Sequence, residues 1–375
     1  MPLSNEDLLR LNVLLAHDLQ AVRIDEQTLT LHGLTQGSEA RVALNPNCRA
    51  DQYLKRVREL LSSHVLGSPG GYPVFLQRWT RMGQAKDAQL EKLLLLGESE
   101  AVVAVAGAPG LTDEIARRAW WVTPTADIAR RMLERENVVR GKMGKVLAGY
   151  LVEHLPFETE PLTVITTVRL VLQPGLIDAA TRQHIWTGGS HRNAYHLGFL
   201  AAVPDTLPVE LPAHPGQAQH RQALSALAAT NALAGLLEKL LGSAGQTFLA
   251  VSADLLRHPL DKYTVAQLLD VIGNYFAPTR PSDAAPDIGS AMARAEAAAE
   301  TGDGEVGLLL AAAPSLRLEI IAMLVLAQCA EALATPILAQ TSATGTLLRR
   351  KLEPVINPLL AQIAVLQGKQ RNGQD

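Results

Sequence analysis

The chain has 375 residues, and its 47% hydrophobic content is enough for a sizeable folded core. Its 34 Lys and Arg residues against 37 Asp and Glu residues give a formal net charge of -3, which excludes an overall basic field for holding nucleic acid or an anionic membrane. Its two cysteines, Cys48 and Cys329, lie far apart in the sequence and have no partner at metal-ligand spacing. We therefore expect neither a disulfide framework nor a structural zinc site.

Two sequence features bear on localisation. The first residues are acidic at positions 6 and 7 and lack the basic leader and apolar run of a signal peptide. The membrane-like candidate, residues 320–340, is interrupted by Glu331 and Pro336, whereas a bilayer requires about 20 uninterrupted apolar residues. We expect a cytoplasmic protein with no membrane span and a buried core helix at 320–340.

Residues 1–87 are predicted to form a small α+β module. Apolar residues at helical spacing indicate helices over 5–17 and 51–65. Between these helices, residues 21–34 and 40–45 alternate apolar and polar side chains on either side of turns. This pattern is typical of a short antiparallel meander.

From residue 88 onward short helical patterns replace the strand signal. Residues 109–121 match residues 174–186 at Pro, Gly, Leu, Asp, Arg and Trp, and each copy lies between two apolar helical runs. A Pro-Gly turn ends one helix, and the following aspartate complements the dipole of the next. We expect the tryptophans to pack inward between stacked helices. The pattern over 88–205 predicts a mainly α fold built as a HEAT-like helical repeat, that is, an α-solenoid.

The rest of the chain divides by composition. Residues 203–220 are rich in proline and are predicted to be a linker. The next predicted division, 206–276, begins within this linker and continues as a helical segment. Residues 277–305 are rich in Ala, Pro, Gly and acidic residues and are predicted to be a second linker. Residues 306–368 have helical periodicity and are expected to form C-terminal helices.

A loop rich in glycine and aromatic residues, 65–84, is the first candidate site. It lacks the Gly-Lys-Ser/Thr ending and the preceding buried strand of a phosphate-binding loop, so nucleotide binding is not expected. Its side chains suit either an interaction surface or a structural seam between the α+β module and the helices. The residues that would form the surface are Tyr72, Arg78, Trp79 and Arg81.

A second candidate surface lies where basic residues gather, between 117 and 145. If several of them line one concave face, that face would attract an acidic or phosphate-bearing partner. If they alternate around helices, they are simply solvated, which is the commoner outcome. The leading residues are Arg117, Arg118, Arg130 and Arg131, followed by Arg135, Arg140, Lys142 and Lys145.

Cys48 is a candidate reactive thiol. It precedes a predicted helix and stands beside Arg49, and both a helix N-terminus and a cation lower a thiol pKa. A lone cysteine with no resolving partner is more often inert. His184, His191 and His196 lack companions at metal-ligand spacing, and no catalytic, cofactor-binding or metal site is predicted.

Four stretches within the first 205 residues carry a resemblance to a known family: NPNCR, VRELLSSHVLGSPGGYPVFLQRWTRMGQ, LLLLGESEAVVAVAGAPGLTDEIARRAWW and VVRGKMGKVLAGYLVEHLPFE. They resemble the sulfur reduction protein DsrS family, accessory proteins encoded with dissimilatory sulfite reductase in sulfur-oxidising bacteria. The resemblance implies a cytoplasmic protein that acts in, or regulates, the oxidation of stored sulfur through the reverse-acting sulfite reductase. It carries over no catalytic residue.

Three hypotheses follow. The first is a non-enzymatic, helical-repeat accessory or regulatory protein of dissimilatory sulfur oxidation that acts through protein–protein contacts. The second is a persulfide carrier or thiol enzyme that uses Cys48. The third is a helical-repeat protein that binds nucleic acid on a basic concave face.

Overall fold

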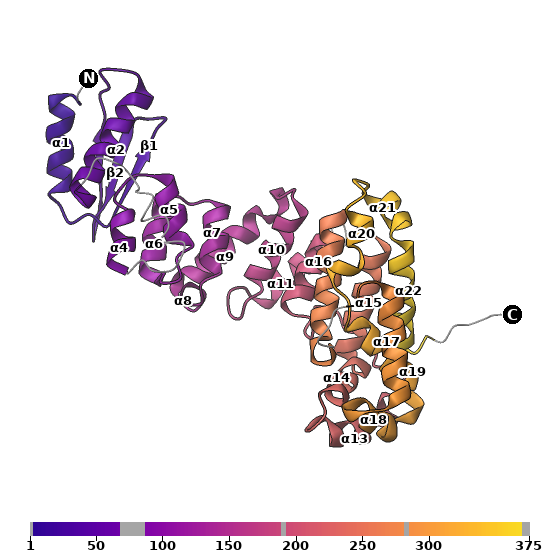
Figure 1. The fold of residues 1–375 in the computed structure, drawn as a ribbon. Helices are drawn as coiled ribbons and strands as arrows, with labels where there is room; N and C mark the ends of the chain where they lie inside the picture. The colour runs from indigo at the N-terminus through magenta and orange to yellow at the C-terminus, as the bar shows by residue number, and fades with distance from the viewer. Residues whose placement is uncertain (1–2, 68–86, 189–192, 281–284, 370–375) are drawn as a thin grey trace. The chain divides into compact units, whose positions relative to one another are not determined.

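A computed structural model describes residues 3–67, 87–188, 193–280 and 285–369. The described chain is mainly helical and carries a small antiparallel sheet near its N-terminus (Figure 1). It divides into two compact units. Unit 1 comprises Met1–Phe157 and Gln173–Ile177, and unit 2 comprises Glu158–Leu172 and Asp178–Asp375.

Unit 1 begins with the predicted α+β module. Three strands form an antiparallel sheet in the order β1-β2-β3, and the side chain of Asp25 accepts hydrogen bonds from the backbone N–H groups of Gln27 and Thr28 to shape the first turn. The predicted meander and both flanking helices are therefore confirmed. The elements are α1 (Asn5–Leu15), β1 (Ala21–Asp25), β2 (Thr30–Leu34), β3 (Glu39–Ala43) and α2 (Ala50–Leu66).

The core of this module lies between the sheet and the two helices. Leu11 of α1, Val22 and Leu31 of the strands and Val57 of α2 are fully buried together. These positions are the apolar ones that the helical and alternating patterns place on the inner faces. The burial of these faces is what makes the short strands stable.

Short helices complete unit 1. Asp113, at the start of α6, accepts hydrogen bonds from the backbone N–H groups of Lys142 (3.1 Å) and Met143 (2.9 Å), and it thereby ties α6 to the N-terminus of α9. Gly141 leaves room for that carboxylate. The elements are α4 (Asp87–Leu93), α5 (Ser99–Ala106), α6 (Asp113–Val122), α7 (Ala126–Leu133), α8 (Glu136–Val139), α9 (Lys142–His154) and η1 (Leu155–Phe157).

Unit 2 contains helices and no strand among its described residues. α10 packs on α12, α13 on α14, and α19 lies between α17 and α22 (Figure 1). The elements are α10 (Pro161–Val171), α11 (Ala179–Gly188), α12 (Asn193–Ala202), α13 (Gln217–Ala228), α14 (Ala232–Leu241), α15 (Ser243–Arg257), α16 (Lys262–Tyr275), η3 (Ala277–Thr279), α17 (Ile288–Thr301), α18 (Gly304–Ala312), η4 (Pro314–Leu316), α19 (Arg317–Leu326), η5 (Glu331–Leu333), α20 (Thr335–Leu338), α21 (Gly345–Lys351) and α22 (Glu353–Leu366).

The two predicted linkers differ from each other. Residues 203–216 contain no helix, in agreement with their prolines. Residues 277–305, in contrast, are not simply a linker, because α17 occupies much of this segment. Alanines four residues apart form its buried face and let it approach α19 closely: Ala291, Ala295 and Ala299.

The membrane-like segment is broken within the fold. α19 is largely buried and ends at Leu326, so the helix expected over 320–340 covers only the first part of that range. Among the described residues no single helix has the length and apolarity to cross a bilayer. Gly304–Ala312 and Pro314–Leu326 meet that test only as a pair, and they are bent by 116°.

The repeated sequence pattern folds differently in its two copies. In the first copy Thr112 caps α6 and Asp113 reaches α9, whereas in the second copy Asp178 itself caps α11 through the N–H of Thr181 (2.7 Å). The boundary between the two units falls within the second copy. The described geometry therefore gives a helical protein with a repeated sequence motif, and the solenoid remains a prediction.

The two tryptophans at the end of the repeat are half-buried rather than fully enclosed. The guanidinium of Arg23 lies 4.9 Å from the Trp121 ring centroid. Trp186 stacks on His196, with ring centroids 4.2 Å apart, and meets Phe199 edge-on. Each tryptophan packs against its own unit, as an amphipathic ring does at the border of a core.

Candidate functional site

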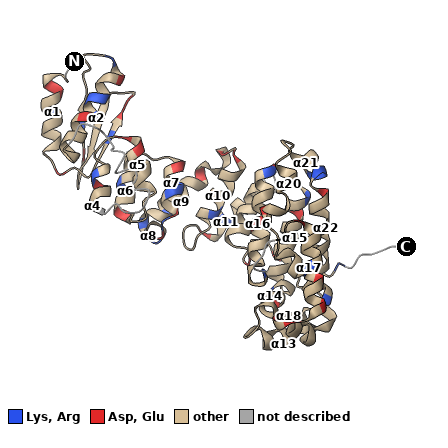
Figure 2. Cartoon of the chain, in the orientation of Figure 1, with Lys and Arg blue, Asp and Glu red and all other residues tan. Residues whose placement is uncertain are grey.

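The predicted contact residues fall into two groups. Tyr72, Arg78, Trp79 and Arg81 lie outside the described residues. The basic residues from Arg117 to Lys145 lie on α6–α9 and their connecting turns in unit 1, where Lys and Arg are interspersed with Asp and Glu (Figure 2).

The first of these cations are bound to carboxylates. Arg117 donates two hydrogen bonds to Glu114, at 2.7 and 2.9 Å, and Arg118 bonds both Glu114 (3.0 Å) and Glu91 (3.4 Å). The hydrogen bond from Arg117 is the main cause that lowers the pKa of Glu114 to about 2, and Arg118 adds to it. Here the positive charge is neutralised locally.

The remaining arginines of this region follow the same pattern. Arg131 pairs with the aspartate four residues before it at 2.9 Å, and Arg135 and Arg140 pair with neighbouring glutamates. Arg130 also has an interaction partner. Within the described part of unit 1, Lys142 and Lys145 are the cations of this stretch for which no ion pair is found. The structure therefore fits the second alternative better, in which the basic residues alternate with acidic ones around solvated helices and do not form a continuous basic face.

Cys48 is half-buried beside the core of the α+β module. Its Sγ lies 3.7 Å from the carbonyl oxygen of Arg49, and the Arg49 guanidinium pairs with Asp51 at 3.3 Å. Cys329 is fully buried in unit 2, and burial raises its thiol pKa to about 12. Of the two thiols, only Cys48 is placed where a reagent reaches it.

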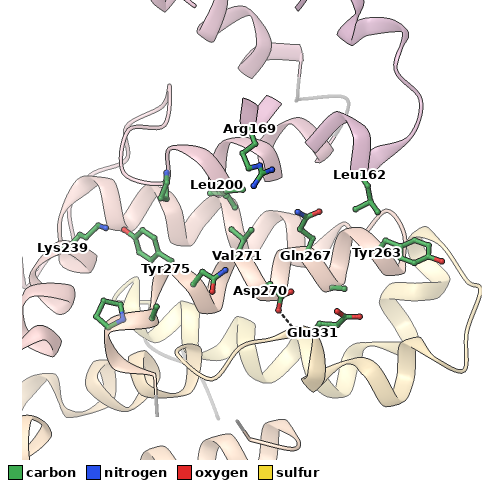
Figure 3. Close-up of a pocket in the computed structure, with 16 residues that line it drawn as sticks. Leu162, Arg169, Leu200, Lys239, Tyr263, Gln267, Asp270, Val271, Tyr275 and Glu331 are labelled. Atoms are coloured by element: carbon green, nitrogen blue, oxygen red, sulfur yellow. Dashed lines mark hydrogen bonds between the residues drawn. The ribbon is translucent and has the colours of Figure 1, made fainter. Parts of the chain in front are cut away.

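A concave surface with charged and polar lining residues lies in unit 2. It is an open groove of about 890 Å³ over the outer face of α16, which we call the α16 groove (Figure 3). Its walls come from α10, α12, α14, η3 and η5. The lining residues are Leu162, Arg169, Leu200, Ala201, Pro204, Lys239, Tyr263, Ala266, Gln267, Asp270, Val271, Asn274, Tyr275, Ala277, Pro278 and Glu331.

The sequence of α16 fixes which of its side chains face this groove. Asp261 caps the helix, accepting from the N–H groups of Tyr263 (2.8 Å) and Thr264 (2.9 Å) in a capping box. Apolar residues at helical spacing bury the opposite face: Val265, Leu268, Leu269 and Ile272. The outward stripe is left with small and polar groups, among them Gln267, Asp270 and Asn274.

A glycine holds one edge of the groove in place. At Gly273 a Cβ would lie 1.9 Å from the carbonyl oxygen of Cys329, so only glycine allows the 327–331 segment to approach α16 this closely. Arg280 donates to the carbonyl of Ala327 at 3.1 Å, and Asp270 accepts the N–H of Glu331 at 2.8 Å. These contacts place the carboxylates of Asp270 and Glu331 along one edge (Figure 3).

A buried aromatic network closes one end of the groove. The Tyr275 hydroxyl donates to Asp205 at 2.9 Å, and its ring stacks on Phe248 with centroids 3.7 Å apart. Lys239 pairs with Asp205 at 2.6 Å and lies 4.4 Å from the Tyr275 ring centroid. Burial, followed by the charge of Asp205, raises the pKa of Tyr275. The Tyr275 hydroxyl is thereby held as a hydrogen-bond donor to Asp205.

Charges of opposite sign remain unpaired on the two sides of the groove. Arg169 of α10 points into it from one edge and forms no hydrogen bond or ion pair with any residue that the structure describes (Figure 3). On the other edge, neither the Asp270 nor the Glu331 carboxylate has a cationic partner among those same residues. The arrangement suits the binding of a ligand that carries both charges.

Sequence reasoning missed this groove. Its residues come from segments as distant as Leu162 and Glu331, and no motif links them. One local signal was available, since α16 carries polar Gln267, Asp270 and Asn274 on a single helical stripe. The opposing Arg169 could not be placed there without the tertiary fold.

The structure describes two of the three histidines between residues 184 and 196. His196 stacks on Trp186, and burial lowers its pKa, whereas His184 is exposed and His191 lies outside the described residues. Over the described ranges, no group of three or more His, Cys, Asp or Glu side chains could hold a metal ion. No protein-family model, curated protein or solved structure matches the chain.

Proposed function

We propose that this chain is a non-enzymatic binding protein that acts through protein–protein contacts, with the α16 groove as its main contact site. The observation that carries the proposal is the pair of edges with unpaired charges of opposite sign facing an open cavity of about 890 Å³. Helical proteins present such surfaces to extended partners. The groove takes its α10 and α12 walls from the range of the predicted HEAT-like repeat, 88–205. The proposal needs no bound cofactor.

The cellular role that we propose follows from the sequence resemblance. We infer a cytoplasmic accessory or regulatory protein of dissimilatory sulfur oxidation, similar to the DsrS family. The partner is then a protein of the sulfur-oxidation machinery. The similarity covers residues 1 to about 205.

The test is a pull-down from cells growing on reduced sulfur compounds, read by mass spectrometry. The wild-type chain is compared with Ala266→Arg, which fills the groove from α16, and with the matched control Ala218→Arg on the exposed face of α13. We expect a sulfur-oxidation protein to be captured by the wild type and the control and lost with Ala266→Arg. If no such protein is captured, or if Ala266→Arg captures it equally well, the proposal is wrong.

The second hypothesis, thiol or persulfide chemistry, rests on the position of Cys48. This half-buried thiol lies just before the N-terminus of α2, a helix of 17 residues. Iodoacetamide labelling at neutral pH separates the two functions, with Cys48→Ser as the control. Under the binding hypothesis we expect Cys48 to react slowly. Modification of Cys48 much faster than that of a free thiol would support the thiol or persulfide hypothesis.

The third hypothesis, nucleic-acid binding, predicts affinity that falls steeply with salt. The ion pairs of Arg117, Arg118 and Arg131 leave little free positive charge on α6 and α7. We therefore expect no salt-dependent retention of the chain on heparin. Retention that requires Lys142 and Lys145 would favour this hypothesis instead.

A further inference from the structure

We propose that the α16 groove binds an extended peptide segment in which an acidic and a basic residue are adjacent. This inference rests on the proposed function and names the chemistry of its ligand. It is carried by two features of the groove: polar side chains spaced along α16, and opposite charges on the two edges.

The polar stripe of α16 matches the repeat of an extended backbone. Gln267 and Asn274 are seven residues apart, and at a rise of about 1.5 Å per residue their Cα atoms are separated by about 10 Å along the helix axis. An extended chain covers that distance in about three residues. Side-chain amides carry both donors and an acceptor, so the pair can bond the backbone N–H and C=O groups of one strand.

The small side chains around this stripe leave room for a backbone to lie close to the helix. Ala266 and Val271 of α16 and Ala201 of α12 line the groove beside the amides. The Oδ1 of Asn274 is 3.5 Å from the Arg280 guanidinium, which leaves its amide hydrogens to donate to a ligand carbonyl. A peptide backbone can therefore approach α16 beside Ala266 and Ala201, between the larger rings of Tyr263 and Tyr275.

The charged edges set the order of side chains in that peptide. Successive side chains of an extended strand point to opposite sides. With the backbone along α16, one side chain faces Arg169 and the next faces Asp270 and Glu331 (Figure 3). The complementary sequence is an acidic residue directly next to a basic one.

The balance of charge favours a peptide over a nucleic acid. The Lys239 ammonium is bound to Asp205, so Arg169 is the cation of the groove that remains available among the described lining residues. It faces the two carboxylates of Asp270 and Glu331. A chain of phosphates would be repelled by that edge, whereas a basic side chain would be held there.

The experiment uses the full chain and a phage-displayed library of random 12-residue peptides. We expect the selected sequences to share one adjacent acidic–basic pair. A selected peptide, synthesised with a fluorescent label, should lose at least tenfold in affinity when one residue is inserted between its two charged residues. That insertion moves both charges to the same side of the strand.

Matched protein variants locate the contact. Arg169→Glu and Glu331→Lys should each weaken the same peptide at least tenfold. The first makes both edges acidic, and the second cancels the net negative charge of the acidic edge, because Asp270 remains beside the new lysine. The triple variant Arg169→Glu, Asp270→Asn and Glu331→Lys exchanges the charges of the edges, keeps an acceptor for the N–H of residue 331, and should recover binding to an adjacent pair. Circular dichroism of every variant checks that the fold is kept.

Three results would overturn the inference: no enrichment from the library, equal affinity for the single variants, or tighter binding of a single-stranded oligonucleotide than of the peptide. These outcomes are separable from failure of the proposed function. If Ala266→Arg abolishes capture of the partner while peptide selection shows no charge pair, the groove binds its partner by other chemistry. If Ala266→Arg has no effect on capture, the proposed function itself fails.

Discussion

Two charged regions of this protein look alike in composition and differ in what their charges do. Along α6–α9 of unit 1, Arg117, Arg118 and Arg131 are each bound to a carboxylate three or four residues away on the same helix. In the α16 groove of unit 2, Arg169 and Glu331 have no such partner among the residues that the structure describes.

The difference shows that the density of charge in a sequence is a poor guide to a binding site. Closely spaced charges of both signs on one helix neutralise one another through contacts at i,i+3 and i,i+4. A charge is available to a ligand when the fold separates it from its opposite, as it separates Arg169 from Glu331 across the groove. Variants that damage either region, and variants that leave stability intact, test this contrast.

The largest effect is expected from Gly273→Ala, which damages the acidic edge of the groove. The added Cβ would lie 1.9 Å from the Cys329 carbonyl oxygen, so the 327–331 segment must move away. We expect a loss of about 3 kcal/mol in the free energy of unfolding. Hydrogen exchange should rise in peptides that contain α16 and this segment.

The matched control is Gly235→Ala in α14, where the nearest atom to the new Cβ is an alanine methyl at 3.7 Å. There the better helix propensity of alanine should stabilise by about 0.5 to 1 kcal/mol. Equal effects of the two substitutions would show that Gly273 does not hold the edge.

A smaller loss is expected in unit 1 from Asp113→Ala. This change removes the acceptor for the N–H groups of Lys142 and Met143 at the start of α9. The cost should be about 1 to 2 kcal/mol in urea unfolding, as for loss of an N-cap. Asp178→Ala, at the exposed cap of α11, should cost less, although the two aspartates occupy equivalent positions in the sequence repeat. Equal losses would contradict the different roles that the structure assigns to them.

The ion pairs of unit 1 predict a pH dependence. The pKa of Glu114 in the folded chain is about 2, below its ordinary value of 4.5, because Arg117 and Arg118 hold the charged form. The stability that this group contributes is therefore fully present above pH 4.5 and is lost as the pH falls toward 2.

We expect Glu114→Gln to destabilise at pH 7 by less than about 1 kcal/mol, since the pairs are partly exposed, and to differ little from the wild type near pH 2. Urea unfolding at several pH values measures this. Glu153→Gln on α9 is the control, because Glu153 is exposed and forms no ion pair within the described ranges. A difference in the free energy of unfolding between Glu114→Gln and the wild type that persists at low pH would refute the ion-pair explanation.

Much of the fold could be predicted from the sequence because it depends on local periodicity. The alternation of apolar and polar side chains predicted the meander at 21–43, and apolar residues at helical spacing predicted α1 and α2. The α17 helix was missed because its alanines resemble a low-complexity linker, and only packing against α19 shows that they form a buried face. The groove could not be predicted, since the partner of α16 across it, Arg169, is set by tertiary contacts rather than by spacing.

The smallest effect on stability is expected at the charged edges of the α16 groove, where the expected effect on peptide binding is largest. Arg169→Ala and Glu331→Ala should each change the free energy of unfolding by less than about 0.5 kcal/mol, because neither side chain has a partner to lose among the described residues. Arg118→Ala, in contrast, removes the ion pair with Glu91 and one of the two ion pairs of Glu114, and should destabilise more. Urea unfolding of the three variants separates charges that maintain the fold from charges that the fold holds ready for a ligand. If Arg169→Ala destabilises as much as Arg118→Ala, Arg169 is a charge that maintains the fold. It is then not available to bind the proposed ligand.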